Sequence, residues 1–178
     1  MPPEFSTLAG RFAVLGDFLH GERFGSGHIN DSYRLTFSQG GARVRYLLQR
    51  ISRTAFHNPP AVMENIVRVT EHLRSKLAAE GESDISRRVV TIVPARDGQP
   101  FARDFEDEYW RMMIFVEGAR GFDALESPDQ AYEAARAFGL FQKRLADLPN
   151  PPLHETIPGF LDGGHRLRNF RRALEKDP

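Results

Sequence analysis

Residues 32–51, SYRLTFSQGGARVRYLLQRI, contain two strand-like stretches on either side of a glycine pair. In Ser32–Phe37 every second side chain is Tyr, Leu or Phe, which places these three on one face of a strand. The Gln-Gly-Gly segment at 39–41 is typical of a tight turn, and Val44–Ile51 again has strand character. We therefore predict an antiparallel hairpin at this place.

A long amphipathic helix is predicted after the hairpin. Asn58-Pro59-Pro60 fits a helix start, because proline is tolerated in the first helical turn. Apolar side chains then recur at three- and four-residue steps from Val62 to Leu77. This spacing predicts about five turns of helix that end near Gly81.

Three more strand-like stretches follow the helix, at Arg88–Val93, Gln99–Arg103 and Tyr109–Val116. Asp97-Gly98 and the acidic residues 104–108 separate them with connections of hairpin length. We predict an α+β lobe with an antiparallel five-stranded sheet and one long helix packed on it.

The pattern becomes helical beyond residue 117. Apolar residues recur at helical spacing from Ser127 to Leu148, and a last short helix carries Leu167, Phe170 and Leu174 on one side. We divide the chain into a lobe at 1–117 and, at 118–178, a hinge with the first helices of an incomplete α-helical lobe. We expect the apolar side chains of this second part to lack partners and to cause self-association.

Composition excludes several classes of protein. The 178 residues include 24 basic and 24 acidic side chains, so no overall charge draws the chain to nucleic acid or to an anionic membrane. There is no cysteine, and the six histidines have no metal-ligand spacing, so we assign no metal site. No stretch approaches the roughly 20 apolar residues of a membrane span, and we expect a cytoplasmic protein.

The glycine-containing segment Gly25-Ser26-Gly27-His28-Ile29-Asn30 is the first candidate site. Glycine lets the backbone approach an anion closely and present N–H groups to phosphate. A dinucleotide-binding fingerprint would need a third glycine and a following helix, whereas here Asn30 and a strand follow. Two interpretations stay open: an ordinary hairpin turn, or a kinase-type loop that covers phosphates.

A kinase-type lobe also needs a cation that faces the phosphates and a helix carboxylate that holds this cation. The strand Arg45–Ile51 has no lysine. Either Gln49 supplies hydrogen bonds alone, or Arg50 supplies the charge from the opposite face of the strand. Glu64 and Glu71 lie about 180° from the apolar stripe of the helix, so both are predicted to face solvent.

The end of the last strand, Phe115-Val116-Glu117-Gly118, lies at the boundary between the two lobes. Such a junction offers backbone N–H and C=O groups to the edge of an adenine. The acidic residues 104–108 carry carboxylates that suit Mg²⁺, but no phosphate-binding segment accompanies them. A solvated turn is the favoured interpretation there.

Seven short blocks, taken in order, resemble the N-terminal half of the aminoglycoside phosphotransferase/choline kinase superfamily. They are Gly25–Asp31, Tyr46–Ile51, Met63–Asn65, Trp110-Arg111, Phe115–Glu117, Phe138–Gln142 and Glu155–Phe160. The resemblance implies an N-terminal lobe with a protein-kinase-like fold. It also implies a kinase that uses ATP and Mg²⁺ and transfers a phosphoryl group to a hydroxyl of a small molecule. The implied acceptor is a sugar of the N-acetylhexosamine kind.

The same resemblance implies roles for individual residues. Gly25, Ser26 and Gly27 would cover phosphate, with Gln49 or Arg50 beneath them. The segment Phe115, Val116 and Glu117 would contact adenine. His28 and Asn30 would lie on the sugar side of the cleft.

The sequence departs from this superfamily at the catalytic elements. Members carry a His-x-Asp loop, whose Asp accepts the proton of the substrate hydroxyl, and a later Asp-x-Asp-like element for Mg²⁺. Neither motif occurs in the 178 residues, so we assign no catalytic residue. We expect a truncated kinase that is inactive by itself. The alternative is a non-catalytic nucleotide- or sugar-binding module that pairs with another chain.

Overall fold

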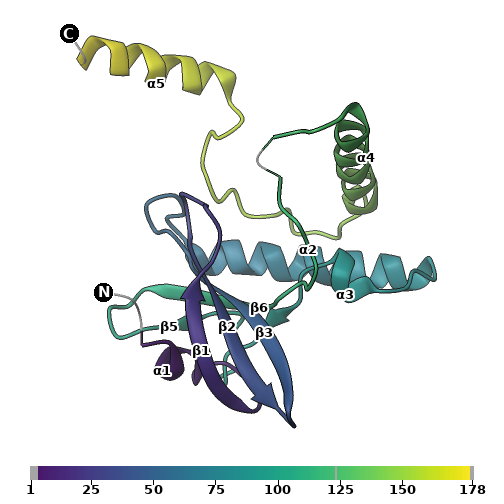
Figure 1. Ribbon diagram of the computed structural model, residues 1–178. Coiled ribbons are helices and arrows are strands. Elements are labelled where there is room, and N and C mark those ends of the chain that lie inside the picture. Colours follow the sequence, from purple (N-terminus) through teal and green to yellow (C-terminus); the bar gives the residue numbers. More distant parts are fainter. Residues whose placement is uncertain (1–3, 123, 177–178) are drawn as a thin grey trace.

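The computed structural model describes residues 4–122 and 124–176. Figure 1 shows the long helix α2 between the sheet and the later helices α4 and α5. The elements in chain order are α1 (Phe5–Ala9), β1 (Asp17–Arg23), β2 (Asp31–Gln39), β3 (Ala42–Arg50), α2 (Pro59–Ala79), α3 (Ile85–Arg88), β4 (Ile92–Val93), β5 (Ala102–Arg103), β6 (Tyr109–Ile114), α4 (Pro128–Leu145) and α5 (Gly163–Lys176).

All strand pairs of the sheet are antiparallel, in the order β1-β2-β3-β6-β4, with β5 beside β6. The predicted hairpin is confirmed, because Ser32 pairs with Gln49 and Phe37 with Val44. The α+β fold class with one long helix is confirmed as well. The sheet has six strands where we predicted five, because β1 adds an edge strand against β2.

Gly21 explains how β1 joins the sheet beside α1. A Cβ at this position would lie 2.6 Å from the ring of Phe5 and 2.8 Å from the side chain of Leu35. Glycine therefore lets α1 pack closely against the strands. Since β1 mixes charged and apolar residues with this glycine, its sequence lacks the alternation that marks β2.

The three later strands are shorter than predicted, and proline explains part of this difference. The stretch Arg88–Val93 forms a strand only at Ile92–Val93, because Arg88 still belongs to α3. The stretch Gln99–Arg103 pairs only from Ala102, two residues after Pro100. Proline has no backbone N–H to donate to a neighbouring strand, so pairing stops beside it.

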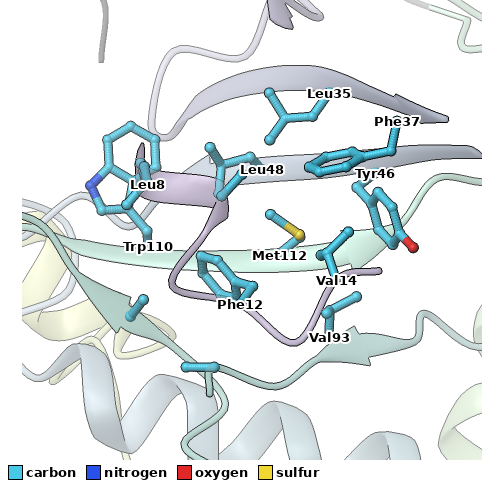
Figure 2. Close-up of a cluster of buried hydrophobic side chains, with 13 residues drawn as sticks. Leu8, Phe12, Val14, Leu35, Phe37, Tyr46, Leu48, Val93, Trp110 and Met112 are labelled. Carbon is cyan, nitrogen blue, oxygen red and sulfur yellow. The ribbon is translucent and has the colours of Figure 1, made fainter. Parts of the chain in front are cut away.

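The main core lies on the face of the sheet that α1 and the following segment cover. Phe12, Leu48 and Met112 are completely buried there. Figure 2 shows these side chains converging between the strands and the N-terminal segment. The buried members of this cluster are Leu8, Ala9, Phe12, Val14, Leu35, Phe37, Tyr46, Leu48, Val93, Ala95, Ala102, Trp110 and Met112.

The helix α2 begins as predicted. The side chain of Asn58 accepts a hydrogen bond from the backbone N–H of Ala61, and prolines occupy the first turn. Leu73 and Leu77 of α2 form a second apolar cluster with Val89, against which Leu145 of α4 packs. The apolar periodicity that predicts the helix therefore also marks its contact with the later helices.

The helices α4 and α5 bury none of their side chains completely. Ser127 caps α4, and polar contacts attach this helix to α2: the His72 ring bonds to the backbone oxygen of Arg144, and Arg144 pairs with Glu80. Leu167, Phe170 and Leu174 on α5 are each about half exposed.

None of the helices in the described ranges is both long and apolar enough to cross a membrane. The division near residue 117 stays a prediction.

The central position of Leu48 generates the first testable prediction. Replacing Leu48 with Ala leaves a cavity between fully buried neighbours and should lower the free energy of unfolding by about 2–5 kcal/mol in urea titrations. Leu15→Ala is the matched control, because Leu15 is 79% exposed and should change stability by less than about 0.5 kcal/mol. Equal losses for the two variants would contradict the packing described here.

Candidate functional site

The glycine segment connects β1 to β2 at one end of the sheet. Gly25 has a φ of +81°, a conformation that L side chains rarely adopt. A Cβ at Gly25 would meet no atom within 4 Å, so the backbone here borders open space. The side chains of Ser26 and His28 are exposed. The loop therefore presents its backbone to whatever binds beside it.

Two contacts fix the ends of this loop. The backbone N–H of Phe24 donates to the carbonyl of Ser32 at 2.9 Å, which closes the hairpin beneath the loop. The side-chain oxygen of Asn30 accepts from the backbone N–H of Ser52 at 3.0 Å. Asn30 thus braces the loop against the end of β3, and only its amide nitrogen stays available to a ligand.

The loop also reaches the end of β6. The ring of Phe24 meets the ring of Phe115 edge-on, with centroids 5.1 Å apart. The guanidinium of Arg34 lies 5.5 Å from the first ring and 5.8 Å from the second. Phe24 and Phe115 are 91 residues apart in the sequence (115 − 24), so this contact joins the loop to the segment after β6.

The segment Phe115, Val116 and Glu117 is held by arginines. The N–H of Phe115 donates to the carbonyl of Arg45 at 3.1 Å, and Arg45 pairs with the Glu117 carboxylate at 2.6 Å. The Glu117 carbonyl accepts from Arg87 at 2.7 Å. Across the described residues, the backbone N–H and C=O of Val116 have no hydrogen-bond partner. Val116 is therefore the residue of this segment whose backbone can serve a ligand.

A row of polar side chains crosses three neighbouring strands on the face opposite the main core. Ser32 pairs with Gln49, and Gln49 pairs with Arg111. The Gln49 amide donates to the Ser32 hydroxyl at 2.8 Å and accepts from Arg111 Nε at 3.0 Å. Since Ser32 lies at the start of β2, directly after the loop, this row begins where the glycine segment ends.

Arg111 is a residue of this site that the sequence analysis left without a role. Desolvation lowers the pKa of its guanidinium, and this side chain forms no ion pair with any carboxylate of the described ranges. One sequence signal was present: Arg111 stands between Trp110 and Met112, both of which are buried in the core. Alternation then puts Arg111 on the other face, but its pairing with Gln49 needs the strand register.

Arg50 lies on the opposite side from Gln49. It pairs with Asp31 across β2 and β3, and this hydrogen bond raises the pKa of Arg50. With Tyr33 and Trp110 it lines a separate hollow beside α1. The structure therefore places Gln49, and not Arg50, in the row that leads to the loop.

The acidic side chains singled out from the sequence face solvent or bond to other groups of the protein. Glu64 and Glu71 are exposed, as predicted, and Glu64 bonds to the His154 ring at 2.8 Å. In the acidic turn, Asp104 accepts from the Trp110 indole at 2.8 Å and from the backbone N–H groups of Glu106 and Glu108. Across residues 4–122 and 124–176, no group of three acidic or histidine side chains could hold a metal ion.

The comparison with known families fits this geometry. Residues 20–177 match the profile of the phosphotransferase enzyme family, known as APH. The chain belongs to this family. The match begins within β1, so it includes the glycine loop, the polar row and the segment after β6. Membership of this family relates the chain to phosphotransferases and supports the kinase-like fold of its N-terminal part.

The contact between Glu22 and Arg34 on this face leads to a second prediction. The hydrogen bond from Arg34, at 3.0 Å, and its charge hold the pKa of the Glu22 carboxyl below its usual range. Arg34→Gln should therefore raise this pKa, as followed by NMR titration of the carboxyl carbon.

The sign of the accompanying stability change follows from the depressed pKa. The pair contributes at neutral pH, and its contribution disappears as the pH falls through the folded-state pKa of Glu22. In Arg34→Gln this acid-dependent loss should shrink. An unchanged Glu22 titration in the variant would show that the contact does not persist in solution.

Proposed function

We propose that this chain forms the nucleotide-binding part of an ATP-dependent kinase that acts on a small molecule. The observation that carries the proposal is the position of the glycine loop, where Gly25 borders open space, at the start of the polar row. This row ends in the Arg111 guanidinium, which has no carboxylate partner in the described part of the chain. Phosphate groups need such N–H donors and positive charge. The family match makes phosphoryl transfer the chemistry that this arrangement serves.

Different residues of the chain suit the phosphates and the adenine of ATP. Gly25, Ser26 and Gly27 have the open backbone that phosphates require. We assign the adenine edge to the free backbone groups of Val116, between Phe115 and Glu117. ATP would supply the phosphoryl group, and the chain would bind and orient its base and phosphates.

The acceptor is the finer part of the proposal. The sequence blocks resemble those of N-acetylhexosamine 1-kinase, so we propose a sugar acceptor of that kind. His28 is exposed on the loop, and two residues further the amide nitrogen of Asn30 has no partner among the described residues, so both suit hydroxyl recognition. A cytoplasmic location, where ATP is available, belongs to the same proposal.

The described residues do not provide a binding site for Mg²⁺. The described residues offer no cluster of carboxylates, and the sequence contains neither a His-x-Asp nor an Asp-x-Asp motif. We therefore derive no step through the metal from this chain. We propose that the 178 residues alone bind nucleotide without transferring phosphate.

A second candidate function is a nucleotide- or sugar-binding module that works with another chain. The exposed apolar side chains of α4 and α5 favour it, with Phe138 at 70% and Phe170 at 60% exposure. Exposed apolar surface of this kind marks interaction sites or self-association. Nucleotide binding is common to both candidates.

ATP binding is the test of the proposed function. Saturating ATP should stabilise the chain in thermal-shift titrations, by about 2.7 kcal/mol at one hundred times Kd. Gly25→Val should weaken ATP binding at least about tenfold, because a β-branched residue cannot hold the φ that the loop requires. Gly41→Val is the matched control, since Gly41 has a similar φ of +86° but lies in the turn between β2 and β3. ATP-independent melting of the unmodified chain would refute the proposal.

Phosphate transfer is tested separately. The purified chain with ATP, Mg²⁺ and N-acetylhexosamines should release ADP no faster than the same mixture without protein. A positioned base alone typically accelerates such reactions by about 10²–10⁴-fold, so its presence would be easily detected. Robust acceptor-dependent ADP release would show that the sequence contains a base that we have not identified.

A further inference from the structure

The guanidinium of Arg111 is unusual in its surroundings. It lies in a hollow between β6 and α2, lined also by Asn65, Val69, Val90 and Met113. The structure gives it one hydrogen bond, from Nε to Gln49, and across the described ranges its terminal nitrogens have no protein acceptor. Since no fully buried polar side-chain atom there lacks a partner, these nitrogens must reach solvent in the hollow.

Within the described ranges, no side chain of α2 forms a hydrogen bond with the Arg111 guanidinium. The Asn65 side chain is already bonded to the backbone N–H and C=O of His154, each at 2.9 Å. The Thr70 hydroxyl is bonded to the carbonyl of Ile66 at 2.8 Å. A guanidinium is permanently charged, and withdrawing such a charge from water without a counter-charge is unfavourable. An anion that enters the hollow would compensate it.

The position of the Arg111 guanidinium indicates which anion would bind in the hollow. Arg111 and Ser32 lie two strand spacings apart, about 10 Å, and Gln49 connects them. The glycine loop follows directly before Ser32. Building on the proposed function, we propose that Arg111 of β6 binds the terminal phosphates of the nucleotide and that Gln49 positions it. The cation of this phosphate site would thus come from the strand next to β3.

This arrangement differs from the one in which a helix carboxylate holds a lysine of the third strand. Glu64 and Glu71 of α2 line another hollow, with Pro94 and Phe101, and do not face Arg111. The guanidinium is oriented by a neighbouring strand of the same sheet. Its placement therefore needs no movement of α2.

Calorimetric titration of ATP and of adenosine into the full 178-residue chain tests the assignment. Arg111→Met should weaken ATP binding by about 10- to 100-fold, the usual effect of losing hydrogen bonds to a charged group, and should leave adenosine binding unchanged. Arg111→Lys should retain part of the ATP affinity, because it keeps the charge. Arg43→Met, at the exposed far end of β3, and Glu71→Gln on α2 are controls that should bind ATP like the unmodified chain.

Thermal melting without ligand separates binding from folding. Arg111→Met should melt no lower than the unmodified chain, because removal of a desolvated charge, which leaves no unpaired carboxylate, offsets the loss of its hydrogen bond to the Gln49 oxygen. A lower melting temperature with joint loss of ATP and adenosine binding would mean a structural role and would overturn the inference. Unchanged ATP binding in Arg111→Met would overturn it while the proposed function stands. If the unmodified chain binds neither ligand, the proposed function fails and the assignment fails with it.

Discussion

The pairing of β3 between β2 and β6 is the constraint on which the rest of the structure depends. Because side chains alternate along a strand, this one strand sends Tyr46 and Leu48 into the main core and Gln49 to the other face. The antiparallel register then sets Ser32 and Arg111 on either side of Gln49. A shift by one residue would bury the amide and expose Leu48, so the core enforces the polar row.

The arginines around this row fall into two groups, those with a carboxylate partner and Arg111. Arg34 and Arg45 on the same face have carboxylate partners: Arg34 pairs with Glu22 of β1, and Arg45 pairs with Glu117 and ties β3 to the segment after β6. Arg111 differs, because its one partner among the described residues is a neutral amide. Its guanidinium is therefore the group of this row that has no counter-ion within the described ranges, and on this the proposed phosphate contact rests.

The helix α2 contacts both the segment around Val89 and the later helix α4. Its apolar side chains Leu73 and Leu77 pack toward Val89 and Leu145, while its polar side chains hold the later part of the chain. Arg68 donates to the carbonyl of Pro149 at 2.8 Å, and Asn65 bonds to both backbone groups of His154. The second part of the chain is therefore attached mainly through hydrogen bonds and ion pairs, whereas Leu167 and Phe170 of α5 remain exposed.

The sequence by itself determined the hairpin, the long helix and the α+β class, because alternation, helical spacing and turn residues are local properties that survive without neighbours. It also located the glycine loop and the segment after β6. The tertiary structure alone decided that β1 joins the sheet, that Arg50 turns to Asp31, and that Arg111 meets Gln49. The physical reason is that strand register and the face a charge occupies depend on partners elsewhere in the chain, 19 residues away for Arg50 and Asp31 and 62 for Arg111 and Gln49, which no local pattern encodes.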